Sequence, residues 1–270
     1  MLKVKDKYKN YLQTRTGIDK YNAFKTILYS EKDTLTENVF SNHISKLKLA
    51  KAISICDVGS GDGKRIIDLT TKINNQFDCN IQLDFIEQSS LMCADFQTNS
   101  QQLDNFCKVE IHAIEVQDTV LQNNYDIVFL IHSIFCFPDF SVFQKLLDRI
   151  KSDGFLYVVT NTADSFLAKL KQELDMQYEV KRYEIKDLLS DLEFHNVHYD
   201  KDSFTTEWTL NSSEVDEKLS VILDWLSLGD FHSFDNARQK QLIGFAKQLS
   251  KQNENQFHFS ETEEVLIITK

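Results

Sequence analysis

Three glycines alternate with other residues directly after a short apolar segment that contains an aspartate. The apolar segment covers residues 53–58 and includes Asp57, and it is followed by Gly59, Gly61 and Gly63. Glycine tolerates positive φ and lets a ligand approach the backbone closely. A helical pattern starts after residue 63, and the first turn of a helix presents free N–H groups and the positive end of its dipole. These features predict a turn between a buried strand and a helix that binds a nucleotide-like cofactor.

The spacing of the glycines distinguishes between two classes of cofactor. The dinucleotide fingerprint is G-x-G-x-x-G, with an acid about 20 residues later. In this chain the third glycine comes one residue too early and Lys64 stands in its place. The next acid at a strand end, Glu87, comes later than that fingerprint predicts. A nicotinamide cofactor is therefore the less favoured interpretation.

The segment D-V-G-S-G-D-G resembles motif I of the class I S-adenosylmethionine (SAM)-dependent methyltransferases. In that family, the acid of the first strand orders the loop, and the glycines let the backbone pass the methionine part of SAM. The resemblance implies SAM as the cofactor. It also implies a cofactor site that includes Asp57, Gly59, Ser60 and Gly61.

A second carboxylate stands where a ribose would be bound. Glu87 ends a predicted strand at 81–87, one strand–helix unit after the glycine loop. A carboxylate at this place can accept two hydrogen bonds from ribose hydroxyls. We therefore favour this role over that of a solvent-exposed acid, and we include Gln88 beside it. The polar stretch 115–118 after the third strand leaves several candidates for contact with adenine, among them Glu115.

Two further residues are candidates for catalysis. His132 follows the fourth predicted strand, whose last residue, Ile131, is a cofactor candidate. Histidine has an ordinary pKa near 6.5 and can act as a general base, so His132 suits removal of a proton from an amine. Glu261 can bind a cationic group or accept a proton through water. The alternatives are a backbone hydrogen bond for His132 and an exposed hairpin position for Glu261.

The elements that position these residues follow from alternating patterns along the chain. Apolar runs typical of buried strands alternate with helical periodicities. They predict an α/β fold with a Rossmann-like, seven-stranded, mostly parallel sheet and helices on both faces. The predicted strands cover 53–58, 81–87, 108–114, 126–131, 155–160, 196–201 and 264–269.

The same patterns divide the chain into four segments of a single globular unit. Residues 1–51 form an N-terminal helical cap, and 52–209 form the SAM-binding core. A helical insertion at 210–255 is expected on the substrate side, as a lid or a dimer surface. The final strand, within 256–270, completes the sheet.

Composition limits the possible partners. The 270 residues carry a net charge of −11, which argues against general nucleic-acid binding. No apolar stretch has the length of about 20 residues that spans a bilayer. The five cysteines form no C-x-x-C pair. This favours a reduced, cytoplasmic protein without structural zinc, and we expect no other metal site. The oligomeric state, monomer or homodimer, does not follow from the sequence.

Motifs spread over nearly the whole chain resemble one branch of the superfamily, the histamine N-methyltransferase-like enzymes. They include residues 8–28, the glycine loop with Ile66-Ile-Asp-Leu69, Phe85-Ile-Glu-Gln-Ser89, residues 126–139, Leu223-Asp-Trp-Leu226 and residues 259–268. The resemblance implies methyl transfer to a small molecule, at an amine or imidazole nitrogen. Methylation of oxygen or sulfur and binding of SAM without turnover are the alternatives.

The resemblance also implies three substrate contacts, and this chain differs from the family at each. His132 replaces a glutamine and Glu261 replaces an asparagine. The N-terminal glutamate falls at Gly17, with Asp19 nearby as a substitute. A pocket with one glutamate and one histidine suits a small cationic amine or imidazole. Aromatic residues, among them Tyr11 and Phe135, are candidates for cation–π contact with such a substrate.

Overall fold

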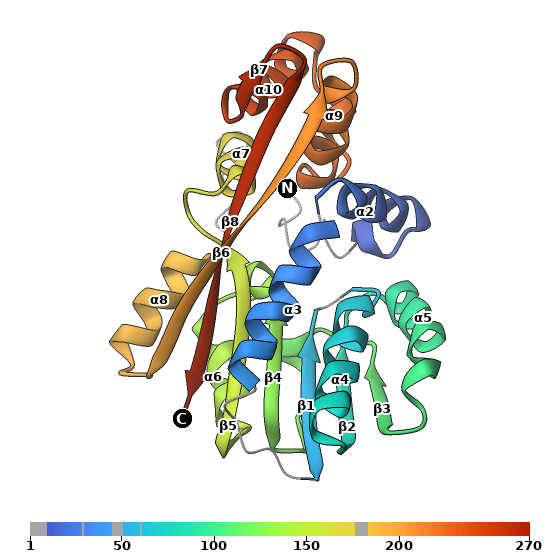
Figure 1. The fold of residues 1–270 in the computed structure, drawn as a ribbon, viewed down its shortest axis with the longest axis vertical. Helices are drawn as coiled ribbons and strands as arrows, with labels where there is room; N and C mark the ends of the chain where they lie inside the picture. Colours follow the sequence, from blue (N-terminus) through green and yellow to red (C-terminus); the bar gives the residue numbers. More distant parts are fainter. Residues whose placement is uncertain (1–9, 29, 45–50, 60, 176–182) are drawn as a thin grey trace. The chain divides into compact units, whose positions relative to one another are not determined.

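Among the described residues, eight strands join one sheet in which β1 lies between β2 and β4. A computed structural model describes residues 10–28, 30–44, 51–59, 61–175 and 183–270. The strands are β1 (Ala52–Val58), β2 (Asn80–Ile86), β3 (Cys107–His112), β4 (Tyr125–Ile131), β5 (Ile150–Asn161), β6 (Tyr199–Asn211), β7 (Lys251–Asn253) and β8 (Gln256–Thr269). Their order is β3-β2-β1-β4-β5-β8-β6, with β7 paired to β8 (Figure 1). Strands β1 to β5 pair in parallel, which confirms the predicted α/β fold and its mostly parallel sheet.

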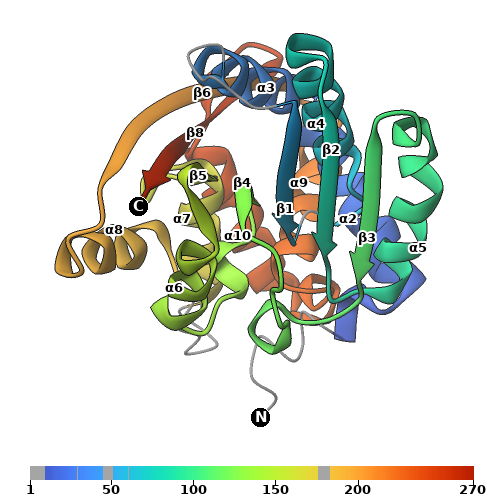
Figure 2. The same cartoon turned by 90° about the horizontal axis from the view of Figure 1, so that it is seen from below.

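Helices cover both faces of the sheet because alternate residues of each buried strand point to opposite sides. The helices are α2 (Arg15–Leu28), α3 (Ser30–Ile44), α4 (Lys64–Phe77), α5 (Ser90–Asn99), α6 (Phe140–Asp148), α7 (Phe166–Asp175), α8 (Ile185–Phe194), α9 (Val215–Leu226) and α10 (Asn236–Gln248). In β4, Val128 and Leu130 join an apolar cluster with α6 and α8. Phe129, between them, points to the other face, where its ring lies 5.1 Å from that of Phe40 in α3. Figure 2 shows α4 and α6 on opposite faces.

The chain groups into two compact units. The first draws on residues within 1–35, 161–181 and 203–263, and the second on residues within 36–160, 182–202 and 264–270. The second unit therefore holds β1 to β5 up to Thr160, with α4 to α6, α8 and the part of α3 from Thr36 onward. The first holds α2, α7, α9 and α10. Strands β6 and β8 contribute residues to both units.

The fifth strand begins earlier than its apolar run predicts. The sequence predicts a start at 155 after a turn at Asp153 and Gly154, but β5 begins at Ile150 and includes both residues. A β-carbon at Gly154 would lie 2.8 Å from the carbonyl oxygens of Tyr125 and Asp126. The glycine is required because the backbone of β4 passes close to it, and the pairing of β4 with β5 changes register there.

The last strand is also longer than the apolar run at 264–269 predicts. Strand β8 starts at Gln256, and its inward positions alternate as Phe257, Phe259, Glu261 and Glu263. The two glutamates are fully buried where apolar residues are expected. Because charged residues stand at these inward positions, the sequence lacks the alternation of apolar and polar residues that would identify the strand.

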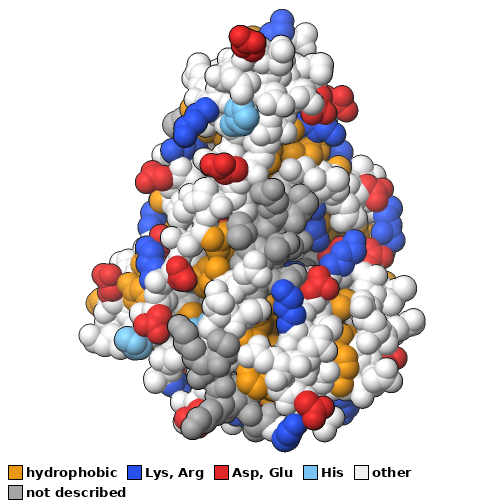
Figure 3. Space-filling model, viewed as in Figure 1, with side chains coloured by type: hydrophobic (Ala, Val, Ile, Leu, Met, Phe, Trp, Pro, Cys, Tyr) orange, Lys and Arg blue, Asp and Glu red, His pale blue; other side chains and the backbone are white. Residues whose placement is uncertain are grey.

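The surface of the described residues is mixed in charge. On the face drawn in Figure 3, lysine and arginine side chains lie among aspartate and glutamate side chains. Within the described part of the chain, each helix is too short or too polar to cross a bilayer.

Candidate active site

The glycine loop follows β1 and has a backbone conformation that is unfavourable for residues with a side chain. Gly59, Gly61 and Gly63 have φ of 75°, 63° and 71°, all in the left-handed region. A β-carbon at Gly63 would lie 2.1 Å from the ring of Phe96 in α5, and Gly63 precedes the first residue of α4. The glycines therefore form a left-handed turn that connects β1 to the start of α4, as the sequence predicts.

Gly59 packs against the end of β4. A β-carbon at Gly59 would lie 2.8 Å from Cβ of Ser133. Because the sheet order reverses between β1 and β4, the ends of these two strands form the topological switch point where ligands bind in open α/β sheets. Ser133 is buried, and its hydroxyl has no hydrogen-bond partner within the part of the chain that the structure describes. We did not expect Ser133 in the site. Its position directly after His132 was the only signal in the sequence.

Glu87 bridges the glycine loop and the start of α5. Its Oε2 accepts a hydrogen bond of 3.3 Å from the backbone N–H of Gly61, and its Oε1 accepts one of 2.8 Å from the N–H of Ser89. Burial raises the pKa of Glu87 to about 7, against the opposing effect of the backbone donors. Ser89 is the N-cap of α5, because its hydroxyl accepts a bond from the N–H of Met92. The carboxylate is thus held at the carboxyl end of β2, beside the loop.

His132 adopts an unusual backbone conformation at the end of β4. Its φ is 55°, in the left-handed region, where residues other than glycine are uncommon. The backbone N–H donates a 2.8 Å hydrogen bond to the carbonyl of Val159 in β5. The His132 side chain is half-buried, and the hydrogen bond to β5 holds the turn from which this side chain projects. Strained positions of this kind are concentrated at functional sites.

The other predicted residues of the second unit lie near the ends of its strands or in the loops that follow them. Asp57 is fully buried, and Ile131 is buried as the last residue of β4. Gln88, Glu115 and Phe135 are half-buried. Ser60 lies outside the described residues. The roles of all of these toward a cofactor or substrate stay predictions.

Glu261 is held inside the first unit. Its Oε2 accepts a 2.9 Å hydrogen bond from the backbone N–H of Leu167, in the first turn of α7, and its Oε1 accepts a bond from the side-chain amide of Asn161. A carboxylate at a helix N-terminus is favoured by the helix dipole. The described hydrogen bonds therefore give Glu261 the geometry of a structural anchor for α7. Its role toward a substrate stays a prediction.

Tyr11 lies in an aromatic cluster of the first unit. Trp225 is in the middle of this cluster, with ring centroids 6.0 Å from Tyr11, 4.8 Å from Tyr21 and 5.7 Å from Phe24. The phenol oxygen of Tyr11 is buried and has no hydrogen-bond partner in the described ranges. Burial raises the pKa of this phenol, and the nearby Asp224 and Asp230 raise it further.

Two acids near this cluster differ in their surroundings. Asp224 is buried and pairs with Lys20 at 2.5 Å through Oδ2, while its Oδ1 has no hydrogen-bond partner. Asp19 is exposed on α2. A side chain at Gly17 is excluded, because its β-carbon would lie 2.1 Å from the carbonyl oxygen of Tyr11. The family glutamate therefore has no place at this position.

Comparison with known proteins identifies the architecture. No protein-family model matches the sequence, and no curated protein matches it. Among solved structures, the plantazolicin methyltransferase BpumL in complex with SAH is 14% identical, with a TM-score of 0.58, and the match covers 98% of this chain and 95% of that one. The YcgJ protein from Bacillus subtilis is 12% identical, with a TM-score of 0.56 over 88% of this chain and 99% of that one. The geranyl diphosphate methyltransferase in complex with GPP and sinefungin is 9% identical, with a TM-score of 0.51 over 88% of this chain and 78% of that one.

The fold is that of the class I methyltransferases. The predicted Rossmann-like architecture is thereby confirmed. The glycine loop, Glu87 and His132 follow the carboxyl ends of β1, β2 and β4 in this fold.

Proposed function

We propose that this protein is a SAM-dependent methyltransferase that acts on a small molecule. The observation that carries the proposal is the glycine loop, with three left-handed glycines beside a buried glutamate at the switch point of the sheet. The glycines at 59 and 63 are required because Ser133 and Phe96 pack directly against the backbone of the loop. Neighbours of the same fold include proteins solved with SAH and SAM.

Within this proposal Glu87 binds the ribose of the cofactor. Its bond to the N–H of Gly61 is long, at 3.3 Å, so Oε2 keeps capacity for a stronger donor. Ribose hydroxyls that donate to the carboxylate favour its charged form and offset the effect of burial. We also assign Asp57, Gly59, Ser60, Gly61, Gln88, Glu115 and Ile131 to the cofactor site.

His132 is the base in this proposal. The cofactor supplies an activated methyl group, so the protein mainly aligns the nucleophile and removes a proton. A neutral imidazole at the end of β4 can accept that proton near neutral pH. An amine or imidazole nitrogen suits such a base, because it must be neutral when it attacks.

The aromatic cluster of the first unit supports a cationic substrate. The rings of Tyr11, Tyr21 and Trp225 attract cations through their faces, and Asp224 adds a carboxylate oxygen without a hydrogen-bond partner. We propose these residues of the first unit as substrate contacts, and Phe135 of the second unit as a separate candidate. The histamine N-methyltransferase-like branch remains the favoured relative within this proposal.

One observation favours a second candidate function. Lys20 pairs with Asp224, and both oxygens of Glu261 accept hydrogen bonds within the first unit. If neither carboxylate binds a cation, the substrate is an uncharged small molecule and transfer goes to oxygen or sulfur. A further alternative is a protein that binds SAM but does not transfer its methyl group.

We also propose that the protein works in the cytoplasm and without nucleic acid. All five cysteines are free, and four of them are buried. The net charge of −11 disfavours a phosphate backbone as partner.

The first test measures SAM binding by calorimetry in the intact protein. We expect Glu87→Ala to weaken binding by about 1.5–3 kcal/mol, the range for hydrogen bonds to a charged group. Glu193→Ala, at an exposed glutamate of α8, should leave the affinity unchanged. Equal affinity in wild type and folded Glu87→Ala would contradict the ribose assignment.

The second test follows label from methyl-labelled SAM to a panel of amines, imidazoles, phenols and thiols. Product from an amine or imidazole, with turnover reduced in His132→Ala but SAM affinity unchanged, supports the first candidate. Product only from a phenol or thiol supports the second. SAM binding with no product from any class would support a silent binding protein.

A further inference from the structure

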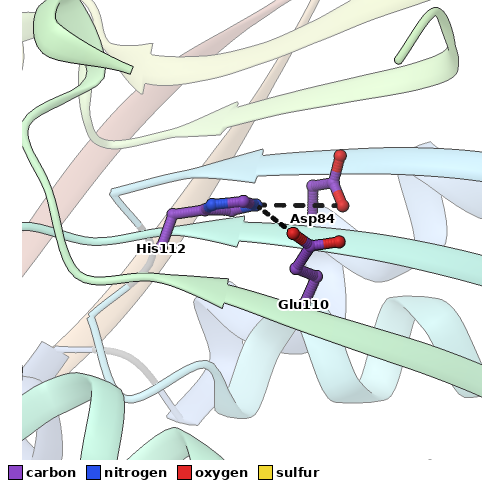
Figure 4. Close-up of side chains that lie close together, drawn as sticks. All are labelled: Asp84, Glu110 and His112. Carbon is purple, nitrogen blue, oxygen red and sulfur yellow. Dashed lines mark ion pairs between the residues drawn. The ribbon is translucent and has the colours of Figure 1, made fainter. Parts of the chain in front are cut away.

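Three side chains with metal-binding chemistry meet on one face of strands β2 and β3. They are Asp84, Glu110 and His112, and one ligand atom from each lies within 4.8 Å of the other two. Nε2 of His112 is 3.9 Å from Oδ1 of Asp84 and 3.9 Å from Oε1 of Glu110 (Figure 4). The cluster is separate from the glycine loop, and nothing in the proposed methyl transfer uses it.

The strand pairing explains why these residues converge. Asp84 of β2 pairs directly with Glu110 of the parallel strand β3, so their side chains share a face. Glu110 and His112 are two residues apart on β3, and the two-residue period of a strand puts them on that same face. The arrangement therefore depends on rigid sheet positions.

Asp84 presents one oxygen toward the histidine without a hydrogen-bond partner. Its other oxygen, Oδ2, accepts bonds of 2.6 Å from the hydroxyl of Tyr125 and 2.9 Å from the side-chain amide of Asn123. Oδ1 is buried without a hydrogen-bond partner among the described residues, and the Asp84 side chain is only 4% exposed. A buried carboxylate oxygen of this kind is costly unless a cation or a donor satisfies it. Tyr125 and Asn123 would act as the outer partners that orient a metal-ligating carboxylate.

We propose that Asp84, Glu110 and His112 bind a divalent transition-metal ion such as Zn²⁺. Metal–ligand bonds of about 2.0–2.2 Å place the ligand atoms of one site roughly 3–4 Å apart, which the 3.9 Å separations approach. One imidazole and two carboxylates suit zinc and its first-row neighbours better than calcium or magnesium, which prefer oxygen alone. The side chain of Glu110 is 56% exposed, so an ion can enter and keep water at its open positions.

The ion would tie β2 to β3 directly beside the cofactor carboxylate. The backbone N–H of Glu87 donates a 3.1 Å hydrogen bond to the carbonyl of His112, a residue of the cluster. Glu87 also follows Asp84 by three residues on the same strand. The proposed role of the ion is therefore to stabilise this edge of the sheet.

The test uses the full chain without an affinity tag, stripped of metal and titrated with Zn²⁺ by calorimetry. Co²⁺ absorbance is the second readout, since its spectrum reports the ligand geometry. We expect one ion per chain and a melting temperature that rises by about 5–10 °C at a hundredfold excess over Kd. His112→Ala and Glu110→Gln should each weaken binding by more than about tenfold, because they remove ligands.

The chain provides a matched control at a second histidine. His198 lies 4.0 Å from Asp200, two residues later, and both side chains are 75% exposed. His198→Ala should leave Zn²⁺ affinity and the Zn²⁺-dependent rise in melting temperature unchanged. Absence of Zn²⁺ binding, or equal loss in His198→Ala and His112→Ala, would overturn the proposal. The cluster would then be a histidine shared between two carboxylates.

Discussion

Glu87 and Glu261 are both buried glutamates that accept hydrogen bonds at the start of a helix, yet they stand in different surroundings. Glu87 follows the end of β2, and its donors are the N–H groups of the glycine loop and of Ser89. Glu261 lies within β8, and its donors are Asn161 and the first turn of α7. One carboxylate has a long bond of 3.3 Å to the glycine loop, whereas the other has a bond of 2.9 Å to the first turn of α7. Burial and helix-start hydrogen bonds are therefore common to both glutamates, and the position in the fold is what distinguishes the carboxylate that we propose for the cofactor from the one that anchors α7.

The largest expected effect is on the free energy of unfolding, when a glycine is replaced in each of the two units. Gly63→Ala places a β-carbon 2.1 Å from the Phe96 ring at a φ of 71°. We expect a loss of about 2–5 kcal/mol in the free energy of unfolding, from the left-handed conformation and overpacking together.

Gly244→Ala is the matched control in the first unit. Its β-carbon meets nothing within 4 Å, in the middle of α10. There alanine should stabilise the helix by about 0.5–1 kcal/mol. Chemical denaturation of both variants measures the contrast, and a neutral Gly63→Ala would show that the glycine loop is not constrained.

The next effect concerns the titration of Glu87. Because burial raises its pKa from 4.5 to about 7, the folded state binds this proton more tightly than the unfolded state. The contribution of this group to stability is therefore complete below about pH 4.5 and is lost as the pH rises through 7, by about 3 kcal/mol.

Glu87→Gln removes that titration. The difference in unfolding free energy between wild type and Glu87→Gln should fall as the pH rises from 5 to 8. Denaturant midpoints at several pH values measure it, with exposed Glu193→Gln as the control. A difference that is constant with pH would mean that Glu87 is charged throughout, like an exposed acid.

Replacing Glu261 tests its role as an anchor. Glu261→Ala leaves the N–H of Leu167 and the amide of Asn161 without their acceptor, and it should cost about 1.5–3 kcal/mol of stability. Glu261→Gln keeps one acceptor oxygen and should cost less. SAM affinity should be unchanged in both. If Glu261→Gln folds like wild type but raises KM for the substrate, Glu261 binds substrate and the comparison fails.

The smallest effect compares two serines that begin helices beside these glutamates. Ser89 accepts a bond from the N–H of Met92, and Ser165 accepts one from the N–H of Ala168. Alanine at either position should lower stability by about 1 kcal/mol. Only Ser89→Ala should also weaken SAM binding, because loss of the cap loosens the start of α5, whose first N–H, at residue 89, holds Glu87. Equal SAM affinities in the two variants would separate the cap of α5 from the cofactor site.

The sequence by itself determined the order of strands and helices and the place of the glycine loop. Both follow from local features, since apolar runs indicate buried strands and the left-handed turn requires glycine. The position of Glu87 after β2 could be predicted for the same reason. These features depend on residues that are close together in the sequence, so the local pattern is enough to predict them.

The tertiary structure alone decided which distant residues meet. The contact of Ser133 with Gly59, the donors of Glu261, and the meeting of Asp84 with Glu110 join residues 26 to 100 positions apart or depend on strand register. A shift of register by one residue would turn Asp84 to the other face of the sheet. The local pattern of β2 does not encode its register against β3, because that register results from the packing of the whole sheet.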